Sequence, residues 1–194
     1  MPLDIGKRLR SELQDGGMTV IMTRETDQFI QLGGRSGLAN RAPADLFVSV
    51  HVNANRNRRI CGIEVYYPRH SVLSSNAPWP PRVAPAEVSL PSMTIKQVLW
   101  DAVLGKTRVS SRRLAMSICR AMREALGAPC RGIKPARFVV LREARMPAVL
   151  VEVGYVTNRS EAQQLSQAAY RQAAAQAIAR GILRYARELE SDPL

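Results

Sequence analysis

The chain has 194 residues, of which 46% are hydrophobic and 23% charged, and its formal net charge is +12. This length and apolar content suffice for a single globular domain, residues 1–194, with a core of its own. No stretch approaches the ~18 apolar residues of a membrane-spanning helix, and the first residues lack the apolar core of a secretory signal. We therefore expect no transmembrane segment and no signal peptide within these residues.

The basic excess is the main feature of the composition. Lysine and arginine number 28 against 16 acidic residues, and all but four of the 28 are arginine. Such a charge favours anionic partners: nucleic acid, a membrane surface or an acidic cell-wall polymer. The alternative is that abundant arginine and alanine reflect genome composition. Because the arginines are dispersed and aromatic residues are few, we expect no specific nucleic-acid interface.

The first part of the chain alternates between helical and strand patterns. Ile5, Leu9 and Leu13 recur at helical spacing, and Gly16-Gly17 follows as a stop signal. The patterns predict, in chain order, a helix over 5–16, a strand over 18–23, a short glycine-weakened helix over 32–41, and strands over 44–53 and 62–67.

Residues 68–109 differ in character and are interpreted as an insertion. Six of the twelve prolines lie here, followed by an amphipathic stretch that ends at Gly105. This composition predicts an irregular, proline-rich arm that carries one short helix. The apolar face of that helix consists of Ile95, Val98, Leu99 and Val103.

The second half continues the alternation of helices and strands. Its patterns predict a helix over 111–126 and strands over 138–141 and 148–153. After Asn158-Arg159-Ser160 they predict helical structure to about 188, with Ser166 as a possible cap of a second helix. Strands with continuous apolar content are typical of sheets covered on both faces. The order of elements predicts a three-layer α/β/α domain with a mostly parallel central sheet.

Two ionisable residues stand inside apolar strands. His51, one of only two histidines, ends the run Ala44–Asn53, and Glu152 interrupts the run Ala148–Tyr155. A buried ionisable group is costly unless a metal, a charge partner or a shifted pKa compensates it. Taken singly, His51 could be a core histidine satisfied by a backbone carbonyl, and Glu152 a carboxylate capped by an arginine such as Arg142.

Several blocks in order give the chain a family resemblance over nearly its whole length. It resembles the catalytic domain of zinc-dependent N-acetylmuramoyl-L-alanine amidases, of the type 3 class. The matching blocks are Thr23-Arg24-Glu25-Thr26-Asp27, Arg35 with Ala39-Asn40, Ala44 to Ala54, Arg131-Gly132-Ile133-Lys134, Phe138 to Leu141, and Met146 to Asn158.

The resemblance implies a site and a reaction. His51 matches the last of three zinc ligands in the family, and Glu152 matches the carboxylate that acts as general base and acid on zinc-bound water. The reaction implied is hydrolysis of the amide between N-acetylmuramic acid and L-alanine in peptidoglycan. Asn53 could orient substrate or could be a plain turn asparagine. Arg35 is interpreted as structural, paired with a carboxylate such as Asp27 or Asp45.

The chain departs from the family at its beginning. Family members carry a first strand, a histidine in a glycine-rich loop and a glutamate ligand before the first helix, and none of these is present here. His70 follows Pro68-Arg69 and no glycine loop, so we expect a solvated loop histidine. Two explanations stay open: a start placed downstream of the true one, which the retained His51 and Glu152 favour, or a natural non-catalytic remnant.

Partners and location follow from the same resemblance. We expect peptidoglycan as substrate, the cell envelope, periplasm or exterior as location, and zinc as cofactor with an incomplete site in this chain. The 68–109 insertion occupies the place of a regulatory lid or activator-docking segment, or is a packed decorative helix. The rival function is a non-catalytic basic module that binds peptidoglycan.

The cysteines carry little information in the sequence. Cys61, Cys119 and Cys130 are odd in number and match no metal-ligand spacing. The sequence therefore supports neither a disulfide framework nor a cysteine zinc site.

Overall fold

The computed structural model describes residues 1–42, 44–69 and 90–191, and for 90–104 it describes the backbone alone. Along the described chain the elements are α1 (Pro2–Asp15), α2 (Leu32–Arg41), β1 (Phe47–Asn53), β2 (Ile63–Pro68), α3 (Leu90–Leu126), β3 (Cys130–Ala136), α4 (Val139–Arg142), β4 (Ala148–Tyr155), α5 (Arg159–Ser166) and α6 (Ala168–Ser191).

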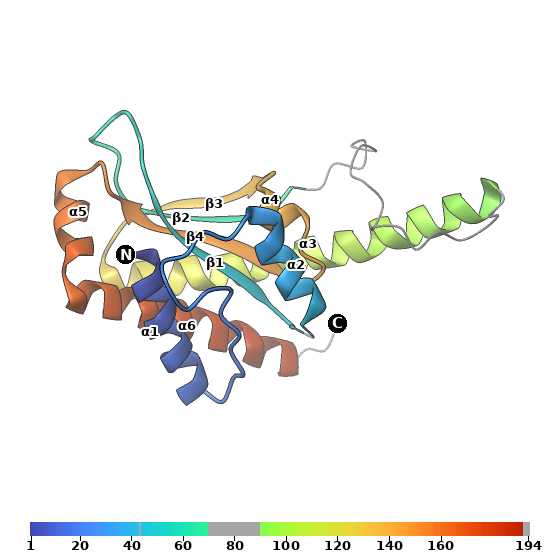
Figure 1. Ribbon diagram of the computed structural model, residues 1–194, viewed down its shortest axis with the longest axis horizontal. Coiled ribbons are helices and arrows are strands. Elements are labelled where there is room, and N and C mark those ends of the chain that lie inside the picture. The colour runs from blue at the N-terminus through green and yellow to red at the C-terminus, as the bar shows by residue number, and fades with distance from the viewer. Residues whose placement is uncertain (43, 70–89, 192–194) are drawn as a thin grey trace.

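The described strands form one mixed sheet in the order β1-β4-β2-β3 (Figure 1). β1 pairs with β4 and β2 with β3 in parallel, whereas β2 and β4 are antiparallel. β4 lies inside the sheet, and all of its residues except Glu152 are buried. The expected mostly parallel sheet with helices on both faces is confirmed.

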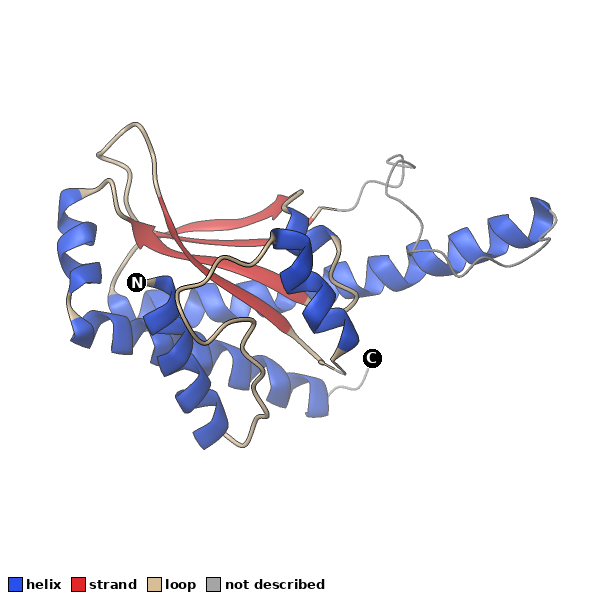
Figure 2. Ribbon diagram, in the orientation of Figure 1, coloured by secondary structure: helices blue, strands red, loops and turns tan. Residues whose placement is uncertain are grey.

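The alternation of side chains along β4 separates two cores. Val149, Val151 and Val153 point to one face, where they pack with α1, α3 and α6, while Ala148 and Leu150 point to the other, where α2 and α4 lie (Figure 2). A strand that helices cover on both faces has to be apolar on both faces. Polar side chains on the second face are therefore expected only where α2 and α4 leave it uncovered.

The helical layer is held together by a close crossing of α3 and α6. A Cβ at Gly181 would lie 2.5 Å from the Cα of Ile118. Only glycine at this position therefore lets α6 approach the backbone of α3 so closely. Ser117 donates a hydrogen bond to the carbonyl of Gly181 at 2.8 Å across the same contact.

Residues 18–23 do not form the predicted strand. They run beside the free edge of β1, and a cavity of about 580 Å³ lies between the two segments. A β-rich sequence forms a strand only where a neighbour can pair with it. The prediction was wrong because the described chain offers no such neighbour at this position.

Two further predictions are corrected. Residues 138–141 were expected to form a strand, but Val139–Arg142 forms helix α4, and the strand of this region is β3. A short apolar run does not distinguish strand from helix, and Val140 and Leu141 are buried on this single helical turn.

Helix α3 continues through Gly105, where the sequence predicted a stop. A helical interior tolerates glycine at a cost of about 1 kcal/mol.

A disulfide joins Cys119 of α3 to Cys130 of β3, with their Cα atoms 6.3 Å apart, and Cys61 is free. The expectation of no disulfide is thus wrong: two cysteines pair and the odd one is left over. The bond ties the end of the longest helix to the edge strand that follows it.

Several sequence predictions lie outside the described residues. These are His70, the proline-rich lead-in over 70–89, and the apolar face of Ile95, Val98, Leu99 and Val103, whose side chains are not described. The backbone of α3 extends well beyond the sheet (Figures 1 and 2). Within the described ranges, no helix is both long enough and apolar enough to cross a membrane.

Candidate active site

The structure brings His51 and Glu152 together on neighbouring strands. They are register partners in the parallel pair β1–β4, and Glu152 is in turn the register partner of Glu64 across the antiparallel pair β4–β2. Register partners point to the same face of a sheet. One histidine and two carboxylates therefore form a row across three strands, on the face that α2 and α4 cover only in part.

His51 is held by a hydroxyl. Its Nε2 lies 2.9 Å from the Oγ of Ser49, which is itself buried two residues earlier on the same face. The partner is therefore a serine, not a backbone carbonyl. Burial, and then the positive charges of Arg35 and Arg24, lower the pKa of His51. The imidazole is neutral near pH 7, and that is the form that can bind a metal.

Glu152 is an uncompensated carboxylate. Its Oε2 is buried and has no hydrogen-bond partner among the described residues. Burial, and then the neighbouring charge of Glu64, raise the pKa of Glu152 to about 7. Arg142 does not cap it, because the guanidinium of Arg142 lies 3.6 Å from Glu143 instead. A carboxyl that titrates near neutral pH can accept and donate a proton under working conditions.

Glu64 is a site residue that the sequence predictions missed. Its side chain is only 4% exposed, and Lys134 Nζ lies 2.6 Å and Arg131 Nε 3.4 Å from its Oε1. Its Oε2 accepts a hydrogen bond from the hydroxyl of Tyr66 at 2.5 Å. Burial alone would raise the pKa of Glu64, but hydrogen bonds from Lys134, Tyr66 and Tyr155 bring it below its usual value. An acidic residue inside the apolar run 63–67 was the signal that could have found it.

Asn53 joins the end of β1 to this network. Its Nδ2 donates to Glu64 Oε2 at 3.3 Å, and its Oδ1 accepts the backbone N–H of Ala54 at 2.8 Å. Asn53 therefore bonds both to a carboxylate of the row and to the local backbone of the turn that follows β1. Arg35 donates from Nε to the carbonyl of Ile30 at 3.1 Å, and among the described residues it forms no ion pair with Asp27 or Asp45, the partners expected from the sequence.

The described residues do not assemble a metal site. No group of three or more His, Cys, Asp or Glu side chains that could hold a metal ion is found among them. His51 is thus a single imidazole beside two carboxylates. Of those carboxylates, Glu64 is already bonded to Lys134 and Tyr66, and Glu152 stands free.

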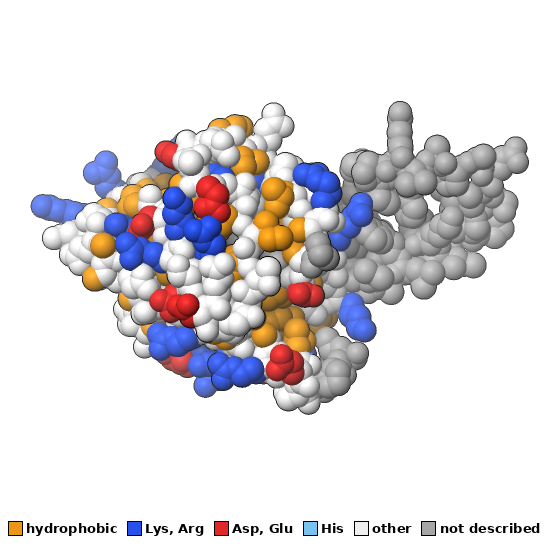
Figure 3. All heavy atoms as spheres, turned by 60° about the horizontal axis from the view of Figure 1, so that its bottom comes forward, with side chains coloured by type: hydrophobic (Ala, Val, Ile, Leu, Met, Phe, Trp, Pro, Cys, Tyr) orange, Lys and Arg blue, Asp and Glu red, His pale blue; other side chains and the backbone are white. Residues whose placement is uncertain are grey.

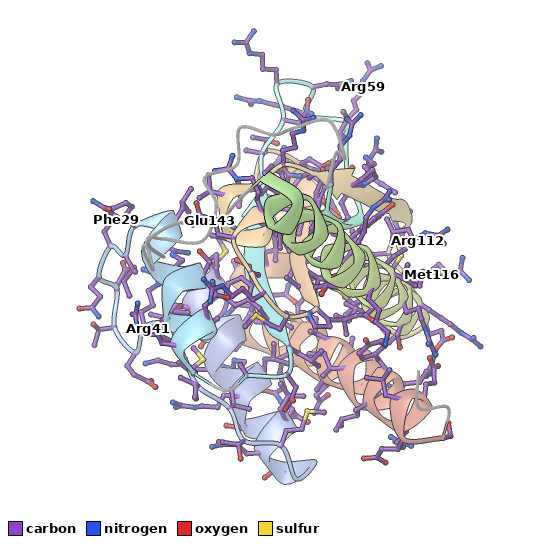
Figure 4. The ribbon with its side chains drawn as sticks, turned by 90° about the vertical axis from the view of Figure 1, so that its right-hand side faces the viewer. Phe29, Arg41, Arg59, Arg112, Met116 and Glu143 are labelled. Atoms are coloured by element: carbon purple, nitrogen blue, oxygen red, sulfur yellow. A yellow bond between two sulfur atoms is a disulfide. The ribbon has the colours of Figure 1, made fainter. Side chains whose placement is uncertain are left out.

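The face of the molecule formed by α1 and α6 carries charges of both signs (Figure 3). Arginine and lysine side chains are spread over the face formed by α1 and α6, with acidic ones between them (Figure 3). Arg112 and Met116 of α3, Arg59 in the loop after β1 and Phe29 in the loop before α2 all point outward (Figure 4).

Fold and site together define an α/β domain in which a histidine and two carboxylates stand in one row across its sheet. The profile of the N-acetylmuramoyl-L-alanine amidase family matches residues 1–184. The chain belongs to this family.

Individual relatives agree with this assignment. The amidase LytC of Bacillus subtilis is 35% identical over 95% of this chain, and the amidase AmiA of Escherichia coli is 32% identical over 94%. The chain spans only 30% of LytC and 66% of AmiA. Among solved structures, the amidase AmiC2 of Nostoc punctiforme has a TM-score of 0.73 at 32% identity, with 95% of this chain and 82% of that chain covered. The catalytic domain of the amidase CwlV of Paenibacillus polymyxa has a TM-score of 0.72 at 28% identity and the same coverage.

Proposed function

We propose that this chain is the catalytic part of a zinc-dependent N-acetylmuramoyl-L-alanine amidase, which hydrolyses the amide between N-acetylmuramic acid and L-alanine in peptidoglycan of the cell envelope. The observation that carries the proposal is the pairing of His51 with Glu152 on adjacent strands. Family membership gives this pair its expected roles of metal ligand and proton carrier.

Glu152 is the proposed general base and acid. Its carboxylate takes a proton from the attacking water and returns it to the nitrogen of the leaving L-alanine. A pKa of about 7 suits both halves of this exchange, because the group is neither permanently charged nor permanently neutral. Asn53 is proposed to orient substrate from the end of β1.

Zinc fits these residues only in part. A catalytic zinc usually has three protein ligands and one water, and His51 is the one ligand proposed here. When bound, zinc would lower the pKa of water to ~7. Since the described residues do not complete a ligand set, we derive no step through the metal and expect the 194-residue form to bind zinc weakly and to cleave poorly.

The test compares two forms on purified peptidoglycan, with release of free L-alanine amino groups as the readout and metal content measured in parallel. A longer form that adds a histidine loop and a glutamate before α1 should be active, and the 194-residue form nearly inactive. In the longer form, Glu152→Ala should abolish hydrolysis with zinc still bound, whereas the exposed control Glu124→Ala should not. Robust hydrolysis by the 194-residue form would contradict the proposed ligand set.

The 68–109 segment is proposed as a regulatory element that covers the cleft or docks an activator protein. Deleting 78–106 from the longer form should raise basal hydrolysis if the segment covers the site. Unchanged or lower hydrolysis by a folded deletion variant would leave the segment as packing or as an activator dock.

The second candidate function is a non-catalytic module that holds peptidoglycan. The incomplete ligand set favours it, as does the net charge of +12. It predicts binding of peptidoglycan by both forms with hydrolysis by neither.

A further inference from the structure

The row of ionisable side chains continues onto a fourth strand, where it ends in two cations. Glu64 of β2 faces β3, and its Oε1 lies 2.6 Å from Lys134 Nζ and 3.4 Å from Arg131 Nε. Lys134 is the register partner of Tyr66, which stands two residues from Glu64 and therefore on the same face of the sheet. From β1 to β3, this face carries in order an imidazole, the free carboxyl of Glu152, a buried carboxylate and two cations.

The two cations carry more charge than Glu64 needs. A buried carboxylate is balanced by one cation, so a second one leaves this group of three side chains with a positive charge in excess. Glu64 is almost fully buried, but the side chains of Lys134 and Arg131 are 43% and 39% exposed. Among the described residues, neither cation makes a further hydrogen bond or ion pair, although ammonium and guanidinium groups have several N–H donors each. Glu64 therefore holds two cations that keep free donors for an anion.

We propose that Lys134 and Arg131 bind a carboxylate of the leaving peptide, on the residue that follows L-alanine. This inference rests on the amidase function proposed above and names the part of the substrate that the β2–β3 side of the site recognises. Carboxylates are the natural ligands of such cations, because the hydrogen bonds between them are charge-assisted. Glu64 is a positioning residue, which fixes both cations and does not itself contact the peptide.

The order of groups across the sheet gives the peptide its direction. In the proposed reaction Glu152 protonates the leaving nitrogen, so the peptide begins there, with His51 on one side and the two cations on the other. Neighbouring strands are ~4.8 Å apart, so cations that reach from β3 to Glu64 lie about 5–10 Å beyond the strand of Glu152. A carboxylate on the residue after L-alanine lies ~7 Å from the leaving nitrogen, because consecutive Cα atoms are ~3.8 Å apart. The two spans agree.

Two matched dipeptides test the carboxylate site in the 194-residue protein, without metal or hydrolysis. Both are L-alanyl-D-glutamate with the side-chain carboxyl capped as its methylamide; one keeps the free α-carboxylate, and the other has a carboxamide in its place. NMR titration should show that the free acid binds about five- to tenfold more tightly, as charge-assisted hydrogen bonds predict, with the largest shifts over residues 131–134. Equal dissociation constants, or no binding of either probe at ~10 mM, would overturn the proposal.

Substitutions assign the preference for the free acid to its residues. Lys134→Met should reduce it to less than about twofold and Arg131→Gln should reduce it by about threefold, whereas Lys134→Arg should retain most of it because a cation remains there. The control Arg120→Gln, which removes an exposed cation of α3, should leave it unchanged. Circular dichroism checks folding, and Arg131→Gln carries the test if Lys134→Met does not fold.

A second arm asks whether the peptide runs the other way, toward His51. The positive charge of Arg35 acts on His51 from that side. If Arg35→Gln removes the preference for the free acid while Arg131→Gln and Lys134→Arg both keep it in full, the carboxylate lies beside His51 and the proposal is overturned.

This inference and the amidase proposal fail in different ways. If the longer form does not hydrolyse peptidoglycan but the 194-residue protein prefers the free acid, the amidase proposal falls and the carboxylate site remains as a peptide-binding site. If the longer form hydrolyses peptidoglycan but neither the protein nor its variants distinguish the two probes, the carboxylate site falls and the amidase proposal remains.

Discussion

Two neighbouring carboxylates show how strongly local partners decide the state of a residue. Glu64 and Glu152 are register partners on adjacent strands, yet the pKa of Glu64 is lowered and that of Glu152 is raised to about 7. The difference lies in their partners: Glu64 has Lys134 and Tyr66, whereas Glu152 Oε2 has none among the described residues. Such a pair separates a carboxylate that stays charged from a carboxyl that titrates near neutral pH.

Replacing Glu152 with glutamine should stabilise the metal-free protein at pH 8 and change it little at pH 5. The pKa of this carboxyl rises from 4.5 to about 7 on folding, so the folded state binds more protons and the free energy of unfolding falls as the pH rises between these values. Glutamine carries no charge, so this loss does not occur, and the free energy of unfolding at pH 8 should rise by about 1–3 kcal/mol. Urea unfolding in EDTA at the two pH values measures it. An equal change at both would contradict the raised pKa.

Lys134→Met should destabilise the protein by about 1–3 kcal/mol at pH 7, because it leaves the buried charge of Glu64 with weaker compensation. The control is Arg120→Met, which breaks the exposed pair with Glu124 and should change the free energy of unfolding by less than about 0.5 kcal/mol. Equal effects of the two substitutions in urea unfolding would show that Glu64 does not depend on Lys134.

At the residue scale, the sequence singled out His51 and Glu152, which are unusual in their own strands, but overlooked Glu64, which is equally unusual in its strand. Whether the roles proposed for His51, Glu152 and Asn53 are correct stays a prediction, but the two strands do bring His51 and Glu152 into register. The partners of Glu64 could not be predicted, because Lys134 lies 70 positions away and meets it only through the pairing of β2 with β3.

At the scale of elements, two helical glycines differ in what surrounds them. Gly181→Ala should destabilise the protein by about 2–4 kcal/mol, because its Cβ would lie 2.5 Å from the backbone of Ile118 and would force α3 and α6 apart. The added Cβ of Gly105→Ala meets no described atom within 4 Å, and the substitution should stabilise α3 by about 0.5–1 kcal/mol. Thermal unfolding of both variants tests the pair, and a loss of stability in both would contradict the open surroundings of Gly105.

The disulfide between α3 and β3 should stabilise the folded state under oxidising conditions. The two cysteines are 11 positions apart, and a loop of that size corresponds to about 2–3 kcal/mol. Cys119→Ser should lose this amount, whereas Cys61→Ser should stay within about 0.5 kcal/mol of the parent. Adding a reductant should abolish the difference between Cys119→Ser and the parent. A difference that persists would assign the loss to packing at position 119.

The sequence predicted those elements whose periodicity is long or strongly apolar, such as α1, α6 and β4. It failed where tertiary context decides. Residues 18–23 have the composition of a strand, but no described strand pairs with them, and residues 138–141 bury apolar side chains on a helical turn. Helix α3 continues through Gly105 because long helical segments lie on both sides of it. A single glycine in the sequence gives no information about those segments.

At the scale of the whole molecule, the net charge of +12 and the proposed site around His51 and Glu152 predict two kinds of binding that salt should separate. Attraction to nucleic acid would rest on dispersed arginines and should fall by about one to two orders of magnitude between ~50 and ~300 mM salt. Retention on purified peptidoglycan through the cleft should fall much less over the same range. Sedimentation with peptidoglycan sacculi and filter binding of DNA measure the two.

Matched variants assign each binding mode to its surface. Replacing the exposed Arg58 and Arg59 in the loop after β1 with serine should weaken DNA binding and spare peptidoglycan, because these side chains point into solvent, as Figure 4 shows for Arg59. Asn53→Ala should do the reverse, since it removes an amide from the candidate cleft and leaves the charge unchanged. Identical salt slopes for both ligands, with both variants equally impaired on each, would instead define a general polyanion binder and refute recognition of peptidoglycan through the cleft.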